Sequence, residues 1–486
     1  MSFTKLKSYN TNDTIAAIAT FPSKSALGVA KISGKTALNI IHKIFIPRRK
    51  KDIRNAKTYT LHYGWIMDRP KTKDQRPKAG KKVIIDEVLV SIMRKPHSYT
   101  CEDVVEISSH GGVVALNKIL GVILKQGCRL AQPGEFTYRA FLNGRIDLLQ
   151  AEGIRNIVEA KTEYTLETAA SQLKGESLEK FDCIKRAIKD IFLLTEVDIN
   201  FPDDCATEFK VIKNKIQKVS CKIKDVLESE KQTRTIKDGL KCVICGKANA
   251  GKSTLFNCLL KEERVIVSEI PGTTRDVIEE TIDVKGVPLR IYDTAGILTP
   301  RNFIEKKAIE KSSKIFNEAD LIMLVLDGSR ALDKDDLFLV NKIKNLCDKK
   351  SNTCDNAKGV VIIINKSDLR QKLNLKNISY IKGFRVKLSA LKKEGITHLE
   401  KAISKTANKF GNKTQDMVFL SAYQSEILKS AYDDIKEAER NLAQSREIDL
   451  VNLSLKNALD NLGKLTGEVF CEELLENIFS NFCIGK

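Results

Sequence analysis

The first quarter of the chain alternates hydrophobic and polar residues with the two-residue period of β-strands. Such patterns cover residues 13–18, 28–32, 59–63, 83–93 and 104–107, and helical patterns interrupt them at 36–44 and 113–126. A basic, proline-containing stretch at 69–82 is typical of a long hairpin loop. These patterns predict an α+β domain over residues 1–122.

The hydrophobic period then lengthens to that of helices. Helical spacing runs from about 148 to 199, from 210 to 237 and again from 417 to 482. Between the last two stretches, residues 239–408 alternate strands and helices in the manner of a Ras-like doubly wound sheet. We therefore predict an all-α bundle made of residues 123–238 and 409–486, with an α/β domain of residues 239–408 inserted into it.

The chain is strongly basic. Lysine and arginine outnumber the acidic residues by 82 to 62, which gives a formal charge of +20. Such a charge favours a polyanionic partner such as RNA. A general lysine-rich composition explains it equally well, because lysine is abundant throughout the chain, including residues 239–408.

Cysteine usage and hydropathy indicate the compartment. The twelve cysteines are scattered, no stretch of 18 apolar residues occurs, and residues 1–12 lack the apolar core of a signal peptide. We expect a cytoplasmic protein with reduced thiols and no membrane partner. Cys242 and Cys245 imitate a metal-binding pair, but side chains three apart on a strand point to opposite faces, so we expect both to pack in the core.

Residues 246–253 have the sequence of a phosphate-binding loop, and an apolar strand pattern precedes them. Its glycines let backbone N–H groups face the phosphates, Lys252 neutralises the β and γ oxygens, and the Ser253 hydroxyl is placed to hold Mg²⁺. The other motifs of a GTPase domain follow in order: Thr273-Thr274, Asp293-Thr294-Ala295-Gly296, Asn365-Lys366-Ser367-Asp368 and Ser389-Ala390. The order of the motifs predicts a nucleotide-hydrolysing domain.

The fourth motif predicts guanine as the base. The Asp368 carboxylate accepts hydrogen bonds from the N1–H and the exocyclic amine of guanine, and adenine offers neither donor there. A buried carboxylate without partners is costly, so ATP should bind more weakly by a factor on the order of 10³ or more. We expect Asn365 to bond the other edge of the base, Lys366 to lie over it and the Ala390 N–H to reach O6.

The glutamine that orients the attacking water in Ras-like switches is absent, because Ile297 follows Gly296. Two replacements are compatible with the sequence. Asn249, Ser268 and Thr273 offer oxygen ligands for a monovalent cation against the phosphates. Alternatively, an acid in the stretch after Ile297 positions the water, and Glu305 and Glu310 are the choices.

Six further blocks carry a resemblance to a known family. They are Asn12-Asp13-Thr14-Ile15, Lys31-Ile32-Ser33-Gly34, residues 98–104, residues 132–137, residues 139–148 and the final Phe482-Cys483-Ile484-Gly485-Lys486. With the GTPase motifs, they make the chain similar to the tRNA modification GTPase MnmE (TrmE) family over essentially its whole length. The resemblance implies an N-terminal folate-binding domain that also forms a homodimer, a helical bundle and the inserted GTPase domain.

The resemblance also implies an activity. A member of this family hydrolyses GTP in a potassium-dependent way and works in a heterotetramer with MnmG, an FAD enzyme. Together they add an aminomethyl or carboxymethylaminomethyl group at C5 of the wobble uridine of certain tRNAs. The one-carbon unit comes from 5-formyl- or 5,10-methylene-tetrahydrofolate.

Carried over position by position, the resemblance implies several ligand sets. The folate contacts are Lys31, Glu106, Arg145 and Lys486. The K⁺ ligands are Asn249, Ser268, the Ile270 carbonyl and Thr273, and the Mg²⁺ ligands are Ser253 and Thr274. The implied catalytic residues are Glu305, Lys252 and Cys483. The other nucleotide contacts are Ala250, Gly251, Thr254, Glu269, Pro271, Gly272, Asp293, Thr294, Ala295, Gly296, Asn365, Lys366, Ser367, Asp368, Ser389, Ala390 and Leu391.

Three positions depart from the family pattern. Lys31 stands where arginine is usual, so a point charge replaces a bidentate fork. Ala248 replaces a proline in the phosphate-binding loop, and Ser268 replaces a threonine but keeps the hydroxyl.

Two other function classes share part of this pattern. A ribosome-assembly GTPase that acts as an RNA-binding switch usually carries a KH-like module, but no Gly-x-x-Gly clamp follows residue 408. A folate aminomethyltransferase with an idle GTPase domain is disfavoured because the guanine and Mg²⁺ positions are intact.

Overall fold

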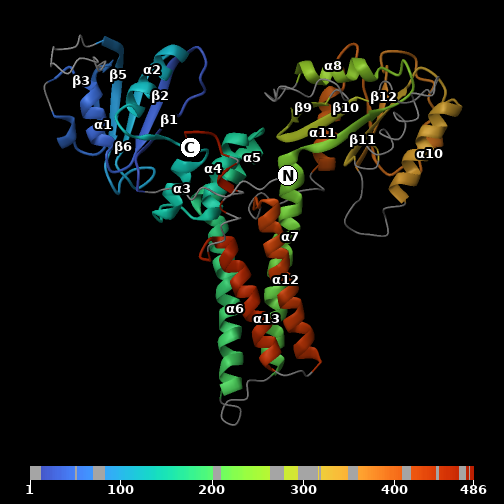
Figure 1. Ribbon diagram of the computed structural model, residues 1–486. Helices are drawn as coiled ribbons and strands as arrows, with labels where there is room; N and C mark the ends of the chain where they lie inside the picture. Colours follow the sequence, from blue (N-terminus) through green and yellow to red (C-terminus); the bar gives the residue numbers. More distant parts are fainter. Residues whose placement is uncertain are drawn as a thin grey trace, which may run out of the picture. The chain divides into compact units, whose positions relative to one another are not determined.

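The computed structural model describes residues 12–49, 52–68, 83–200, 209–262, 279–293, 316, 319–348, 359–407, 418–444, 448–469, 475, 478–480 and 482–485. The chain divides into two compact units (Figure 1). Unit one comprises residues 1–155, 173–213 and 426–486, and unit two comprises 156–172 and 214–425. Both units combine helices with a β-sheet, so the predicted multidomain α+β and α/β fold class is confirmed.

Unit one contains a seven-stranded sheet in the order β3-β4-β5-β6-β2-β1-β7. All neighbouring strands run antiparallel except β1 and β7, which are parallel. The alternating patterns in the sequence correspond to these strands. Their bounds are β1 Ile15–Ile18, β2 Ser25–Ser33, β3 Phe45–Pro47, β4 Thr60–Asp68, β5 Val83–Met93, β6 Val104–Gly111 and β7 Arg129–Leu130.

Helices α1 (Ala37–Ile44) and α2 (Val113–Leu124) cover one face of this sheet, as Figure 1 shows. Their apolar sides join those of the strands in one core, which includes Ile41, Ile119 and Val90. The 3₁₀ turn η1 (Ile53–Asn55) contributes Ile53 to it. The expected domain boundary at residue 122 lies inside α2, and β7 extends the sheet to Leu130.

The opposite face of the sheet is covered over part of its width. Ile15 and Ala17 of β1 pack there against Phe136 of α3 (Glu135–Leu142) and against Tyr99. On β4 and β5 the same face carries exposed hydrophobic side chains, among them Leu61, Tyr63 and Leu89.

The continuous helical pattern of residues 148–199 corresponds to three helices: α4 Leu148–Glu159, α5 Glu163–Lys174 and α6 Glu176–Asn200. The first break arises because Thr162 and Thr165 exchange hydrogen bonds, Thr165 N to Thr162 Oγ1 at 3.2 Å and Thr162 N to Thr165 Oγ1 at 3.1 Å, which caps α5. The second break is at Gly175, whose φ of +99° ends a helix at little cost.

Three long helices complete the helical part of the chain. They are α7 (Phe209–Asp238), α12 (Ala422–Ala443) and α13 (Ile448–Thr466). Within unit one, α6 and α13 pack side by side, and Asn452 joins them: its amide donates to Glu196 Oε1 at 2.6 Å and its oxygen accepts from Thr195 at 3.1 Å.

Unit two contains a six-stranded sheet in the order β13-β12-β11-β8-β10-β9. Every neighbouring pair is parallel except β9 and β10. The strands are β8 Leu240–Cys245, β9 Glu279–Val284, β10 Val287–Asp293, β11 Leu321–Asp327, β12 Gly359–Asn365 and β13 Phe384–Lys387. The connecting elements are α8 (Lys252–Glu262), α10 (Lys334–Asp348), α11 (Ile396–Ala407) and the 3₁₀ turn η2 (Leu375–Ile378).

Hydrophobic clusters cover both faces of this sheet, as a doubly wound architecture requires. Cys242 belongs to one cluster and Cys245 to the other, which confirms that they are packing residues. Burial raises the pKa of the Cys245 thiol to about 12, so it stays protonated.

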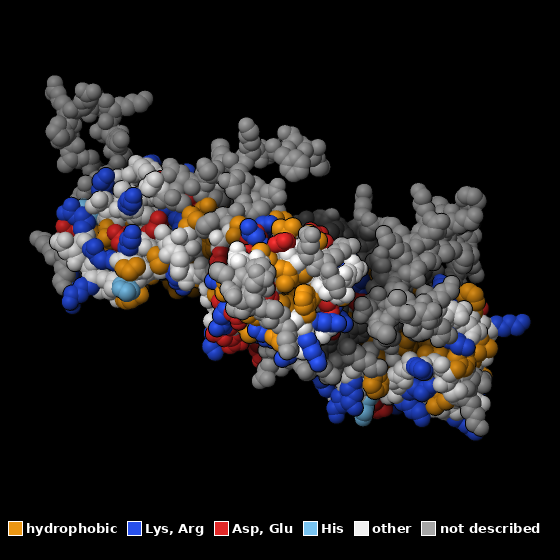
Figure 2. Space-filling model, turned by 90° about the horizontal axis from the view of Figure 1, so that it is seen from below, with side chains coloured by type: hydrophobic (Ala, Val, Ile, Leu, Met, Phe, Trp, Pro, Cys, Tyr) orange, Lys and Arg blue, Asp and Glu red, His pale blue; other side chains and the backbone are white. Residues whose placement is uncertain are grey.

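Basic side chains are widely distributed. Figure 2 shows lysine and arginine spread over the visible face rather than gathered in one patch. Within the described ranges, none of the helices is long and apolar enough for a membrane span.

A buried charge network fixes α3 to the first sheet. Arg139 is 1% exposed and bonds Asp13 Oδ1 at 2.7 Å, Glu135 Oε1 at 3.0 Å and Glu102 Oε2 at 3.3 Å. Arg129 bonds Glu135 at 2.7 Å and Asp13 at 2.8 Å. Burial raises the pKa of Asp13, but its bonds to the two arginines outweigh this and lower it overall. Asp13 therefore stabilises the fold above its ordinary pKa, and that contribution is lost as pH falls through the lowered value.

We predict that Arg139→Ala destabilises the N-terminal sheet by about 3–5 kcal/mol, because it leaves the fully buried Glu135 without one of its two arginine partners. Trp65 on β4 is the single tryptophan, so its fluorescence during urea unfolding reports on this sheet. Arg186→Ala, at an exposed position of α6, is the matched control. Equal unfolding midpoints for the two variants would contradict the assigned role of the network.

Candidate functional site

The phosphate-binding loop connects β8 to α8, and its backbone curls in conformations that suit anion binding. Asn249 has a φ of +64° and Gly251 a φ of +95°. A Cβ at Gly246 would lie 2.3 Å from the Val325 carbonyl oxygen, and one at Gly251 would lie 2.1 Å from Asn365 Nδ2. Only glycine fits at either position. Such a loop at a helix N-terminus directs N–H groups toward a phosphate.

Lys252, Ser253 and Thr254 form the first turn of α8. Lys252 is largely buried, and its Nζ donates to the Lys247 carbonyl at 2.9 Å, so it lies across the loop it would serve. The Ser253 and Thr254 side chains are exposed. This arrangement leaves a hydroxyl at the N-terminus of α8, where a metal-bound phosphate would sit.

Asn365, at the end of β12, ties two loops together. Its Nδ2 donates to the Ala250 carbonyl at 2.9 Å, and its Oδ1 accepts from the Ala390 N–H at 3.0 Å. The Asn365 side chain and the Ala390 N–H, which we expected to contact the base, are therefore hydrogen-bonded to each other in this structure. The effect is to fix the phosphate-binding loop relative to the loop at Ser389, Ala390 and the exposed Leu391.

The base-recognition motif continues at Lys366, Ser367 and Asp368. A hydrogen bond from Ser389 lowers the pKa of Asp368, although desolvation opposes it, so this carboxyl is an ionised acceptor. Lys366 has a φ of +61°, and its Nζ lies 2.7 Å from Asp327 Oδ2.

Asp327 and Asp333 are two site residues that sequence reasoning missed. Asp327 ends β11 next to the ends of β12 and β8, and this position at the carboxyl edge of a parallel strand was the available signal. Burial raises the pKa of Asp327, but bonds from Lys366 and Ser329 lower it overall. Asp333 contacts Lys247 of the phosphate-binding loop, and Asp335 lies 3.1 Å from the same Nζ. No sequence motif marks that ion pair.

Several predicted site residues lie outside the described ranges. They are Ser268, Glu269, Ile270, Pro271, Gly272, Thr273, Thr274, Thr294, Ala295, Gly296, Glu305, Glu310 and Lys486. Asp293 is the last residue of β10, opposite Ile244 of β8, so its backbone reaches the edge where the phosphate-binding loop begins.

A second cluster lies on the N-terminal sheet. Lys31 of β2 stands opposite Glu106 of β6, and their Nζ and Oε1 atoms are 3.6 Å apart. The Tyr99 ring receives two cations: Lys31 Nζ lies 4.4 Å and Arg145 Cζ 4.7 Å from its centroid. Each contact is a cation–π interaction. The structure thus brings two predicted folate contacts, Lys31 and Arg145, onto Tyr99, a residue to which the sequence assigned no role, and it places the third, Glu106, beside Lys31.

The C-terminal residues pack against the same domain. The Gly134 N–H donates to the Cys483 carbonyl at 3.4 Å. Gly485 has a φ of +98°, and a Cβ there would lie 2.7 Å from the Ile18 carbonyl oxygen. Cys483 itself is exposed. The close packing at Gly485 fixes the chain end on β1, immediately before Lys486.

We predict that Asp368→Asn lowers the affinity for GTP by a factor on the order of 10³, because two hydrogen bonds from guanine to a charged acceptor are lost. Xanthosine triphosphate, whose C2 carbonyl can accept from the new amide, should bind the variant better than GTP does. Calorimetry with both nucleotides tests this, and retained xanthosine triphosphate binding shows that the variant is folded. Unchanged GTP affinity would contradict the assigned role of Asp368.

Comparisons with known proteins give both family profiles and solved structures. Residues 14–145 match the profile of the GTP-binding protein TrmE N-terminus, and residues 148–483 match the MnmE helical domain. Among solved structures, the G domain of the T. maritima FeoB iron transporter is 25% identical, covering 35% of this chain and 98% of that one, with a TM-score of 0.26. Aquifex aeolicus Era is also 25% identical, covering 43% of this chain and 68% of that one, with a TM-score of 0.27.

Whole-length relatives carry a single description. The tRNA modification GTPase MnmE of Alkaliphilus oremlandii is 40% identical over 480 residues, 98% of this chain and 99% of that protein. The protein of the same name from Carboxydothermus hydrogenoformans is 41% identical over 484 residues, again 98% and 99%. Identity at this level over the full length, together with the two profile matches, shows that the chain belongs to the tRNA modification GTPase MnmE family and is a GTP-binding GTPase of tRNA modification.

Proposed function

We propose that this GTPase acts with the FAD enzyme MnmG, in a heterotetramer, on the wobble uridine of certain tRNAs in the cytoplasm. The product is an aminomethyl or carboxymethylaminomethyl group at C5 of that uridine. A tetrahydrofolate supplies the one-carbon unit when it is bound. The observation that carries the proposal is that Lys31 and Arg145, from separate segments, both contact the ring of Tyr99, while Glu106 lies beside Lys31.

The chemistry of this cluster fits a folate. A pterin presents a flat ring with an amide edge, and its tail ends in glutamate carboxylates. In this proposal Glu106 accepts hydrogen bonds from the pterin edge, and Arg145 binds a carboxylate of the tail. Tyr99 provides an aromatic surface, and burial raises the pKa of its hydroxyl, which bonds Thr137 at 2.9 Å and stays neutral. Lys486, directly after the fixed Gly485, is proposed as a further cation for the tail.

Lys31 stands where the family resemblance implies an arginine. Its Nζ is already held by Glu106 and lies between the rings of Tyr99 and Phe136, at 4.4 Å and 5.1 Å from their centroids. An ammonium group offers a point charge, whereas a guanidinium offers a planar fork. In this role Lys31 orients Glu106 rather than clamping a carboxylate by itself.

The phosphate-binding loop is proposed to hold GTP with Mg²⁺ and K⁺. Ser253 and Thr274 would provide the Mg²⁺ oxygens, and Asn249, Ser268, the Ile270 carbonyl and Thr273 the K⁺ oxygens. A cation at the phosphates offsets developing negative charge, as an arginine finger does elsewhere. Glu305 is proposed to position the attacking water. Cys483 is proposed to take part in the modification chemistry, since it is exposed and close to the N-terminal domain.

A homodimer is proposed through the N-terminal sheet. Leu61, Tyr63 and Leu89 form an exposed apolar row on β4 and β5, and Tyr63 stands directly opposite Leu89. An apolar strip on the open face of a sheet is the kind of surface that a second copy covers. The formal charge of +20 supports tRNA as the other partner.

We predict a division of labour between the two sites. Arg145→Ala should abolish folate binding and wobble modification while GTP hydrolysis stays near the wild-type rate. Lys252→Ala should abolish hydrolysis and modification while formyl-tetrahydrofolate binding in the absence of nucleotide is unchanged. Calorimetry, phosphate release and mass spectrometry of tRNA nucleosides measure the three quantities. Loss of GTP hydrolysis in folded Arg145→Ala protein would contradict the proposal.

The cation assignment yields a separate prediction. GTP turnover should be slow in Na⁺ and should rise strongly in K⁺. Asn249→Gly should remove the difference, and glycine is the suitable replacement because Asn249 has a φ of +64°. Phosphate release at constant Mg²⁺ measures the rate, and GTP affinity serves as the control. Equal rates of the wild-type protein in both salts would refute a potassium site.

A further inference from the structure

Two segments connect the GTPase fold to the helices. The first is the end of α7, where Asp238 is followed by Gly239 with a φ of +84° and then by β8, which leads straight into the phosphate-binding loop. The second returns at Val418 and Phe419, after residues 408–417, which lie outside the described ranges. Any movement of the GTPase fold must pass through these two segments.

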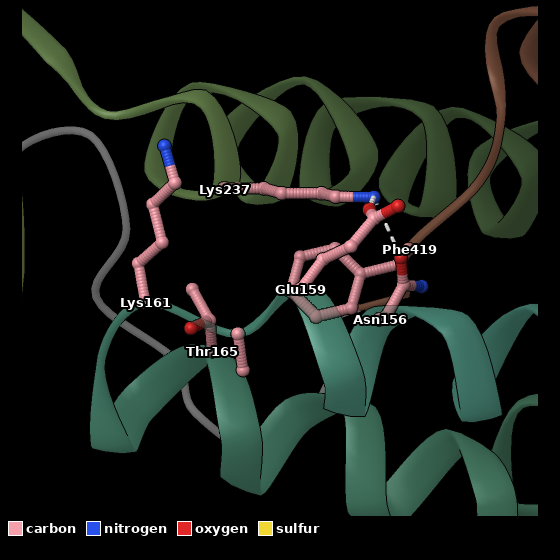
Figure 3. A pocket seen from close by; sticks show the side chains of 7 residues that line it. Asn156, Glu159, Lys161, Thr165, Lys237 and Phe419 are labelled. Carbon is pink, nitrogen blue, oxygen red and sulfur yellow. Dashed lines mark hydrogen bonds and ion pairs between the residues drawn. The ribbon is translucent and has the colours of Figure 1, made fainter. Parts of the chain in front are cut away.

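Helix α4 contacts the first of these segments through Lys237. Its Nζ donates to Asn156 Oδ1 at 2.6 Å and lies 3.5 Å from Glu159 Oε2. Figure 3 shows Lys237 reaching along the pocket to these two residues, with the Phe419 ring beside them and Lys161 pointing away. The Lys237 ammonium lies 5.9 Å from the centroid of that ring, so it also faces the second segment.

Helix α5 contacts the second segment. Gln172 Nε2 donates to the Phe419 carbonyl at 3.1 Å, and Gln172 Oε1 accepts from Asn156 Nδ2 at 3.5 Å. Asn156 and Gln172 are 4% and 1% exposed, so their bonds are sheltered from water. A buried polar group that loses its partner pays its full desolvation cost, which holds these four residues together. We call Lys237, Asn156, Gln172 and Phe419 the α4 clamp.

Helix α4 begins beside the proposed folate site. Leu148, its first residue, follows Arg145 by three positions, with Ile146 and Asp147 between them. The Gln150 N–H donates to Asp147 Oδ1 at 2.8 Å while the Asp147 N–H donates to Gln150 Oε1 at 3.0 Å, a reciprocal cap that fixes the start of the helix. From Leu148 to Asn156 the helix rises only about 12 Å, a little more than two turns.

We propose that Asn156 and Gln172 are positioning residues that carry the nucleotide state of the GTPase fold to the Arg145 site through α4. The inference rests on the proposed function, since it names that site as the receiver. A shift of β8 or of the Phe419 segment between GTP and GDP states moves the clamp. The clamp moves the far end of α4, and the rigid helix moves its capped end beside Arg145.

The test uses the full-length variants Asn156→Leu and Gln172→Leu, which keep side-chain volume but remove the bonds. Each is assayed for GTP hydrolysis, for thermal unfolding and for wobble-uridine modification in a deletion strain. We expect the rate of GTP hydrolysis to stay within about twofold of wild type. We expect wobble-uridine modification to fall at least about tenfold, a change within the range of typical allosteric coupling. Lys237→Arg keeps a donor toward Asn156 and should retain modification.

Asn461→Ala is the matched control, because Asn461 bonds Asp434 at 2.8 Å within unit one, whereas the four clamp residues belong to unit two. Normal modification in both leucine variants would overturn the clamp. A parallel fall in GTP hydrolysis, modification and melting temperature would also overturn it, because it would show that the residues have a purely structural role. If the wild-type gene itself fails to restore modification in the deletion strain, the proposed function fails instead, and the two failures are thereby distinguished.

Discussion

A polar group that is taken out of water must find a partner, and this requirement fixes the parts of the molecule on which function depends. Arg139, 1% exposed, holds α3 to the first sheet through Asp13, Glu102 and Glu135. Asn365, equally sheltered, joins the phosphate-binding loop to the Ala390 loop. Apolar packing builds the two sheets, but these directional bonds set the positions of the loops that meet ligands.

The sequence was sufficient wherever a residue's role depends on its near neighbours. The turn at Gly246 and Gly251, the strand that precedes it and the order of the later motifs are local signals, and each has its counterpart in the fold. The helical pattern of 148–199 was local too, yet it did not reveal the two breaks. The breaks depend on the reciprocal hydrogen bonds between Thr162 and Thr165 and on the positive φ of Gly175, which hydrophobic spacing does not encode.

Contacts between side chains that are distant along the chain could not be predicted from local patterns. Lys31 and Arg145 both contact the Tyr99 ring only because β2 and the loop after α3 lie beside it. Asp333 pairs with Lys247, and Asn156 with Lys237, across segments that share no motif. In each pair the residue type alone is ordinary, and only the contact seen in the structure indicates its role. The two ends of α4 illustrate the consequence, because one helix joins a candidate ligand site to the connections of a GTPase.

The central claim is that the nucleotide state changes the Arg145 site through α4. The dependence of folate affinity on the bound nucleotide tests this claim directly. Formyl-tetrahydrofolate affinity should be measured by calorimetry on the wild-type protein and on Asn156→Leu, each loaded with GDP and with a non-hydrolysable GTP analogue. The account predicts that the wild-type affinities differ between the two states by about fivefold or more, and that the variant shows one affinity in both. Equal wild-type affinities in the two states, or an undiminished difference in the variant, would contradict it.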